Sequence, residues 1–215
     1  MSELTIIQKI SIWALPVLFA ITLHEVAHGW VAMKLGDRTA ERLGRLSLNP
    51  LEHIDPIGTL LVPGLMLLGT GMIFGWAKPV PVDFGKLRNP RTDMVWVALA
   101  GPVANLLMAI FWALMIRLAV LLHSEFISQP LGLMGQAGIA INVVLMVLNL
   151  LPLPPLDGGR IAVGLLPSRM AYQYSKVEPY GFWILLILMW TNLLWLFMGF
   201  PVSIFQALMN GIAGI

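Results

Sequence analysis

Two histidines and a glutamate lie within five positions of the otherwise apolar stretch ITLHEVAHGWVAMKLG, residues 21–36. His24 and His28 are four residues apart, which places two imidazoles on one face of a helix, one turn apart. This spacing suits two ligands of a tetrahedral zinc ion, and Glu25 beside the first histidine is placed to act as a general base. The alternative is a pair of buried histidines satisfied by hydrogen bonds. In a membrane helix such a polar cluster is costly and indicates a function.

A hydrolytic zinc site needs a third protein ligand and leaves the fourth position for water. The chain contains no cysteine, so this ligand must be a histidine, an aspartate or a glutamate. The candidates are Glu41, Glu52, Asp55, His53, His123, Asp157 and Glu178. Asp157 fits best, because the proline- and glycine-rich stretch NLLPLPPLDGG (149–159) must break a helix and expose groups to a cavity. Asp55 is next, and capping of the following helix is the alternative role for Asp157.

The composition indicates that these residues belong to a polytopic membrane protein. Of the 215 residues, 58% are hydrophobic and 11% are charged, whereas an average soluble domain has about 25% charged residues. We expect an all-α fold in one domain, residues 1–215, with a tail from Pro201 along the outer membrane surface. The net charge of +2 is no signature of nucleic-acid binding. About four transmembrane helices are expected, over residues 5–34, 94–122, 131–152 and 180–199.

A fifth apolar stretch, 57–76, contains a proline and five glycines, which weaken a straight lipid-facing helix. If this stretch enters the membrane and returns, residues 34–56, 77–93 and 153–179 lie on one face and hold eleven of the thirteen lysines and arginines. The positive-inside rule then makes that face cytoplasmic and places the N-terminus outside. The histidine pair and Asp157 then lie at a similar depth near the cytoplasmic side. We therefore favour a re-entrant segment over a fifth span.

Three motifs together resemble the site-2 protease family of intramembrane metalloproteases. They are HEVAH in the first helix, AGPVAN at 100–105 and NLLPLPPLDGG, and they occur in the order found in the family. The resemblance covers nearly the whole chain. It implies that His24, His28 and Asp157 bind a single Zn²⁺ ion and that Glu25 is the catalytic base.

The resemblance also implies that Asn149 binds substrate or stabilises an oxyanion, and that GWAKPVPV (75–82) forms a membrane-associated strand or loop that pairs with unwound substrate. From the residues alone, KPVPV can equally be an extended connector, because its prolines limit pairing. The small residues of AGPVAN are interpreted as helix-packing positions, with a role of Asn105 beside the metal as the alternative. Unlike many family members, this protein is expected to have no PDZ or CBS domain and no membrane helix ahead of the zinc helix.

These features predict a zinc-dependent intramembrane endopeptidase that hydrolyses peptide bonds in or near transmembrane segments. The expected partners are the lipid bilayer and a membrane-protein substrate that contains a transmembrane helix. Binding of nucleic acid is not expected, and the sequence does not decide whether the protein forms a homo-oligomer. The expected location is the plasma membrane of a prokaryote, with the active site towards the cytoplasm. One alternative is a zinc-binding membrane transporter, which has no need of a glutamate between two ligands. The other is a non-catalytic scaffold for membrane helices, which has no need of an intact zinc motif.

Overall fold

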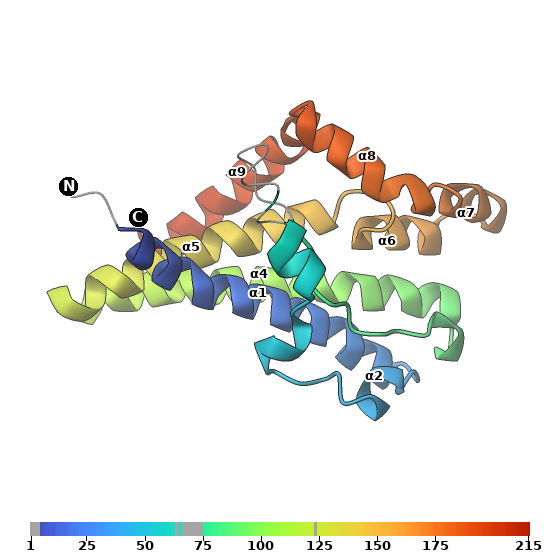
Figure 1. Cartoon of the computed structure of the whole chain (residues 1–215), viewed down its shortest axis with the longest axis horizontal. Coiled ribbons are helices and arrows are strands. Elements are labelled where there is room, and N and C mark those ends of the chain that lie inside the picture. The colour runs from blue at the N-terminus through green and yellow to red at the C-terminus, as the bar shows by residue number, and fades with distance from the viewer. Residues whose placement is uncertain (1–4, 63–64, 66–74, 123) are drawn as a thin grey trace.

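A computed structural model describes residues 5–62, 65, 75–122 and 124–215 of the chain, and Figure 1 shows the arrangement of its helices. The α-helices are α1 (Ile6–Lys34), α2 (Thr39–Arg42), α4 (Pro90–Leu122), α5 (Glu125–Asn149), α6 (Asp157–Leu165), α7 (Ser168–Ser175), α8 (Glu178–Trp190) and α9 (Leu193–Ala213). Three shorter helical turns are η1 (Pro50–His53), η2 (Pro56–Leu61) and η3 (Phe84–Lys86). No strand is assigned within the described residues, so the prediction of an all-α fold is confirmed.

Within the part of the chain that the structure describes, four helices are long and apolar enough to cross a membrane, namely Ile7–Lys34, Pro90–Leu122, Phe126–Asn149 and Leu193–Ala213. The first begins at a capping box, in which the Thr5 and Gln8 side chains each accept a hydrogen bond from the other residue's backbone N–H. Large apolar side chains such as Leu107 and Phe111 are exposed on α4, as expected where a helix faces lipid. The chain is therefore an integral membrane protein, and its described residues contain the predicted number of spans.

The fourth span lies further along the chain than the sequence predicted. The apolar run 180–199 is broken at Asn192, whose φ of 60° is left-handed, and Pro201 lies inside α9. The predictions of one span over 180–199 and of a surface tail from Pro201 are therefore wrong. The break falls at Thr191–Asn192, because both residue types bond to local backbone and asparagine tolerates the left-handed region. Membrane helices in turn tolerate an internal proline.

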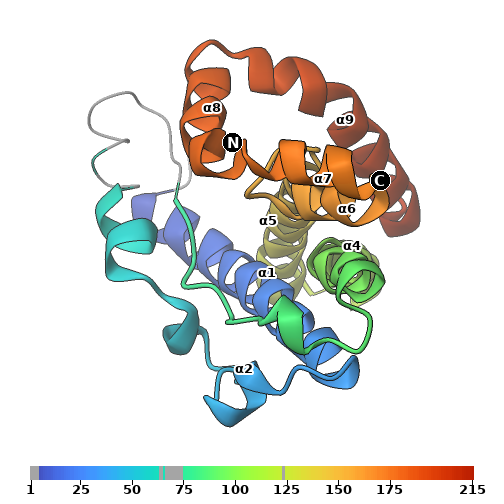
Figure 2. The same ribbon diagram turned by 90° about the vertical axis from the view of Figure 1, so that its right-hand side faces the viewer.

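Helix α4 is the central element of the bundle. It packs against α1, α5, α6 and α9, and Figure 2 shows it nearly end-on, with α1 and α5 beside it. The core joins three helices through buried side chains that include Trp112 of α4, Val143 of α5 and Met198 of α9. On α5, Gly138 lets the Trp112 indole lie against the backbone, since a Cβ there would approach the ring to 2.2 Å. Because α4 also packs against α1 and α6, it positions the two helices that carry the candidate metal ligands.

The apolar stretch 57–76 returns to the point where it begins. The Trp76 N–H donates to the Gly58 carbonyl oxygen at 3.0 Å, and the Thr59 hydroxyl donates to the Trp76 carbonyl oxygen at 2.9 Å. Residues 63–64 and 66–74 lie outside the described residues, so the path between these ends is not described. Two ends that are hydrogen-bonded to each other lie on the same side of the membrane, which supports the re-entrant interpretation.

The carboxylate of Asp37, just after α1, bonds to the backbone at Asp83, in the segment that precedes α4. Asp37 is fully buried and accepts hydrogen bonds from the Thr39 N–H at 2.9 Å and the Asp83 N–H at 2.7 Å. Burial alone raises the pKa of Asp37, but bonds from the Thr39 hydroxyl, the Asp83 N–H and the Thr39 N–H, together with the charge of Lys86, lower this pKa below its usual value. The ionised carboxylate therefore stabilises this junction.

We predict that Asp37→Asn lowers the free energy of unfolding by about 1–3 kcal/mol at pH 7, because an amide group would face an N–H donor. The folded-state pKa of Asp37 is depressed, so the stabilisation is present above the ordinary carboxyl pKa and is lost as pH falls through the lower folded value. Thermal unfolding in detergent between pH 3 and 7 measures this effect. The difference between wild type and variant should shrink below about pH 4, and a difference that grows on acidification contradicts the assignment.

Candidate metal centre

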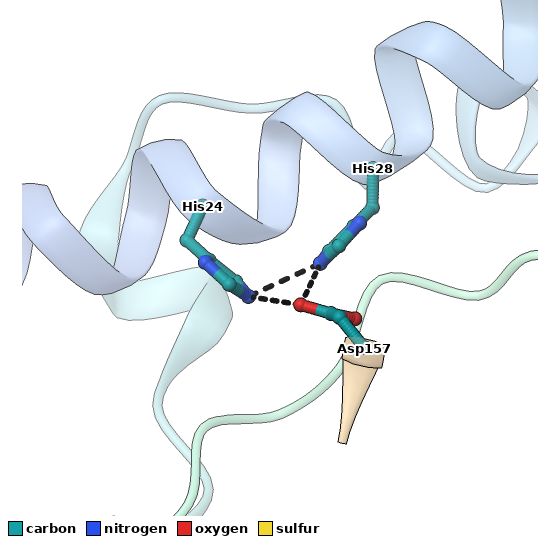
Figure 3. Close-up of side chains that lie close together, drawn as sticks. All are labelled: His24, His28 and Asp157. Carbon is teal, nitrogen blue, oxygen red and sulfur yellow. Dashed lines mark hydrogen bonds and ion pairs between the residues drawn. The ribbon is translucent and has the colours of Figure 1, made fainter. Parts of the chain in front are cut away.

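The structure brings His24, His28 and Asp157 together. Figure 3 shows the two imidazoles leaving one face of α1 towards the aspartate at the start of α6. Each histidine Nε2 lies 3.3 Å from Asp157 Oδ2, and the two Nε2 atoms are 3.1 Å apart. All three ligand atoms lie within 4.8 Å of one another. Their residue types and separation suit a single metal ion.

Among the described residues, the other candidate ligands do not join this group. Asp55 caps η2 by accepting from the N–H groups of the second and third residues after it, and Nε2 of the buried His53 bonds to the Ser47 carbonyl oxygen at 2.8 Å. Glu178 pairs with Arg160 at 3.7 Å. Glu41 pairs with Arg38 in a surface contact, Glu52 is exposed, and His123 lies outside the described residues.

Asp157 does not cap the helix that it begins. The N-cap of α6 is Leu156, which makes no side-chain capping bond, while Asp157 is the first helical residue and its carboxylate faces the histidines. The next residue, Gly158, is close to backbone, because a Cβ there would lie 2.3 Å from the Leu151 carbonyl oxygen. The capping alternative is therefore not realised, and the tight turn directs Asp157 towards α1.

Hydrogen bonds at the far side of each ring fix the histidine tautomers. His24 Nδ1 lies 2.6 Å from Asn105 Oδ1, and the Asn105 amide nitrogen donates to Asn142 Oδ1 at 2.9 Å. The Asn105 oxygen therefore faces the ring, and Nδ1 of His24 must carry the hydrogen. Nδ1 of His28 likewise donates to the Val97 carbonyl oxygen at 2.7 Å. Both rings consequently present the unprotonated Nε2 to the site, as metal-binding histidines do.

Three electron-pair donors therefore face one point. In these tautomers neither Nε2 carries a hydrogen, and the buried Asp157 Oδ2 accepts no hydrogen bond from a described residue. Such an arrangement is unfavourable without a positive charge between the donors. Two imidazole nitrogens and one carboxylate oxygen, with a position left for water, form a donor set that zinc binds in hydrolytic enzymes. The residues present fit a zinc ion.

Two residues of the AGPVAN motif, Gly101 and Asn105, contact the histidines of the candidate metal centre. A Cβ at Gly101 would lie 2.4 Å from His28 Nε2 and 2.5 Å from His24 Cε1, so only glycine leaves room for both rings. Asn105 is fully buried and bonds to His24. The interpretation of this motif as helix packing alone is wrong, and the alternative role of Asn105 beside the metal site fits the structure. The sequence could not separate these readings because both require small and amide residues on one helix face.

Asn142 is a residue that the sequence reasoning missed. It is fully buried on α5, accepts from Asn105 and donates to the Gly138 carbonyl oxygen at 2.8 Å. It thereby fixes the orientation of the amide that bonds His24. The signal that could have found it is a lone amide in the middle of an apolar membrane segment, which is costly unless it is used.

We predict that Asn142→Leu weakens zinc binding by about 10–100-fold, because Asn105 loses the acceptor that orients its amide. Competition with a chromophoric chelator measures the affinity. The control is Asn210→Leu, the same substitution at an exposed position of α9, which should leave the affinity unchanged. Equal affinities of Asn142→Leu and wild type would show that the amide pair does not support the histidine.

The predicted base and amide line the same cavity as the three candidate ligands. This cavity has a volume of about 360 Å³ and is lined by Glu25, Asn149 and residues of the segment that precedes α4. Glu25 Oε2 accepts a hydrogen bond from the Val80 N–H at 2.9 Å. The Asn149 amide nitrogen donates one hydrogen to the Leu145 carbonyl oxygen at 3.0 Å, and its second donates to no described residue. All five residues singled out in the sequence therefore border one cavity.

Comparison with known proteins gives one family and several relatives. The model of peptidase family M50 matches residues 115–192. The chain is 41% identical over 177 residues to "Putative zinc metalloprotease YwhC" of Bacillus subtilis (strain 168), covering 81% of this chain and 78% of that protein. It is 32% identical over 188 residues to "Putative zinc metalloprotease Rip2" of Mycolicibacterium smegmatis, covering 84% and 68% of the two chains. No solved structure matches the chain.

Proposed function

The chain belongs to peptidase family M50, the site-2 protease family of zinc metalloproteases, and from this membership we propose that it is an intramembrane endopeptidase. Its substrates are membrane proteins, cleaved in or near a transmembrane helix. The observation that carries the proposal is the convergence of three electron-pair donors, two from the membrane-spanning helix α1 and one from α6, with Glu25 and Asn149 bordering the same cavity. A site at this place acts on peptide bonds that lie within the bilayer.

We assign the roles as follows. His24, His28 and Asp157 hold the zinc ion, which when bound lowers the pKa of its water towards about 7 and polarises a peptide carbonyl. Glu25 takes a proton from the attacking water and delivers it to the leaving amine. Asn149 donates its second amide hydrogen to the developing oxyanion.

The substrate must be partly unwound at the cleaved bond, because the carbonyls of an intact membrane helix are already hydrogen-bonded. The cavity is suited to an extended backbone, since Pro79, Val80 and Val82 line it beside Glu25. The clustering of lysine and arginine in the loops that flank α1, α4 and α6 favours a cytoplasmic location for this end of the bundle. We propose the plasma membrane of a prokaryote as the location.

Zinc-dependent cleavage of transmembrane peptides by the purified protein tests the proposal. The protein, in detergent, is given a panel of transmembrane peptides and a set of water-soluble peptides of matched sequence length. We expect cleavage within or next to the apolar segment, complete loss of cleavage on chelation, and recovery with about one equivalent of zinc. Zinc movement across proteoliposomes without any cleavage would instead identify a transporter, and peptide binding without cleavage in the zinc-loaded protein would identify a scaffold.

A further inference from the structure

The segment Lys78–Asp83 runs beside the cavity, and hydrogen bonds hold its backbone at both ends. The Lys78 N–H donates to the His53 carbonyl oxygen at 2.9 Å, and the Asp83 N–H donates to Asp37 at 2.7 Å. The Arg45 guanidinium donates to the Lys78 carbonyl oxygen at 3.2 Å. Both ends of the segment are therefore fixed to the part of the chain that follows α1, and its position relative to Glu25 is set by these bonds.

Prolines restrict the hydrogen-bond donors that this segment presents. Pro79 and Pro81 have no N–H, and the residue before each proline is driven towards extended backbone. Since successive N–H groups of an extended chain point to opposite sides, Val80 and Val82 present theirs to the same side. The Val80 N–H donates to Glu25 Oε2 at 2.9 Å, so this side faces the cavity. The Val82 N–H donates to no described residue.

We propose that the Val80 N–H is a substrate-binding group that Glu25 occupies in the resting protein. A carbonyl oxygen of the unwound substrate takes over this N–H, and Glu25 is released to act on water. The inference rests on the proposed function, because it concerns the peptide substrate of the same site. It links activation of the base to the arrival of an extended peptide.

Glu25 and a substrate carbonyl oxygen compete for the Val80 N–H because Val80 is held in place beside the cavity. Val80 is 7% exposed, and its side chain packs against α1, where a Cβ at Gly29 would lie 2.7 Å from Val80 Cγ1. The backbone of each residue carries a single N–H donor, so Glu25 Oε2 and a substrate carbonyl oxygen cannot both accept a full hydrogen bond from Val80. The substrate therefore binds the Val80 N–H at the expense of Glu25, which restrains the base until a peptide displaces it.

Val80→Pro tests the proposal, because it removes the N–H in a segment already flanked by prolines. The matched comparison is Val80→Ala, which loses the same side-chain packing and keeps the N–H. For a cleavable transmembrane peptide, we expect KM of Val80→Pro to exceed that of Val80→Ala by about fivefold, the worth of one backbone hydrogen bond. The value of kcat should be no lower in Val80→Pro than in Val80→Ala. A lower kcat at equal KM would show that Val80 only positions Glu25 and would overturn the proposal.

A binding measurement keeps the test independent of catalysis. In metal-free protein, a fluorescent transmembrane peptide should bind Glu25→Ala about fivefold more tightly than wild type, because its competitor for the Val80 N–H is gone. The same Glu25→Ala change should give no gain in the Val80→Pro background. Equal affinities of Glu25→Ala and wild type, or an equal gain in both backgrounds, overturn the competition. Failure of the proposed function is distinct, since the wild-type protein would then cleave none of the peptides.

Discussion

Replacing Glu25 by glutamine should abolish peptide cleavage and leave the zinc content of the protein unchanged. Glutamine has the same shape but cannot take the proton of the attacking water, and loss of a general base costs about 10²–10⁴ in rate. Zinc should stay bound, because the candidate ligands are His24, His28 and Asp157, while Glu25 bonds to Val80. Rates on a transmembrane peptide and metal analysis of the same sample measure both quantities.

The matched control for this variant is Glu41→Gln. Glu41 is an exposed glutamate of α2 that pairs with Arg38 at 3.6 Å, away from the cavity. This variant should cleave at the wild-type rate, because an exposed ion pair contributes little. Cleavage by Glu25→Gln within tenfold of wild type would contradict the assigned role, and so would loss of its zinc.

Replacing Asp157 by alanine should remove both zinc and cleavage. The carboxylate is the only anionic member of the three-residue group, and without it two imidazoles remain. We expect zinc affinity to fall by more than about 100-fold, beyond the 10–100-fold typical of residues that only support a ligand. Equilibrium dialysis against buffered zinc measures the affinity, and peptide cleavage at saturating zinc measures the remaining activity.

Asp55→Ala is the informative control, because Asp55 was the second candidate for the third ligand on sequence grounds. Its carboxylate accepts hydrogen bonds from Ile57 and Gly58 at 2.9 Å each, so its loss should destabilise η2 and leave zinc bound. An equal loss of zinc in Asp55→Ala and Asp157→Ala would show that the metal does not depend on Asp157 in particular.

The candidate ligands could be predicted because each follows from a local rule. Helical periodicity places His24 and His28 on one face of α1. The prolines and glycines at 149–159 require a break beside Asp157, and the charge distribution places both segments at the same membrane face. These rules use only short stretches of sequence or the sum of charges. They give the side-chain types and their depth, which is enough to propose a metal centre.

The contacts that orient the site could not be predicted, because they join segments far apart in the chain. Asn142 reaches His24 only through Asn105 of another helix, so its role depends on the packing of α1, α4 and α5. The bond from Val80 to Glu25 uses a backbone N–H, which every residue except proline carries and which leaves no mark in the sequence. The break at Asn192 was not predicted, because two polar residues, Thr191 and Asn192, within a long apolar run are also compatible with a continuous membrane helix.

Anomalous scattering at the zinc edge from crystals of the zinc-loaded protein would locate the metal relative to the three candidate ligands. We expect a single strong peak between His24 Nε2, His28 Nε2 and Asp157 Oδ2, with each bond about 2.0–2.2 Å long. The same peak should be present in Glu25→Gln and absent in Asp157→Ala. A zinc ion that lies elsewhere, or a site that stays without metal at saturating zinc, would contradict the account.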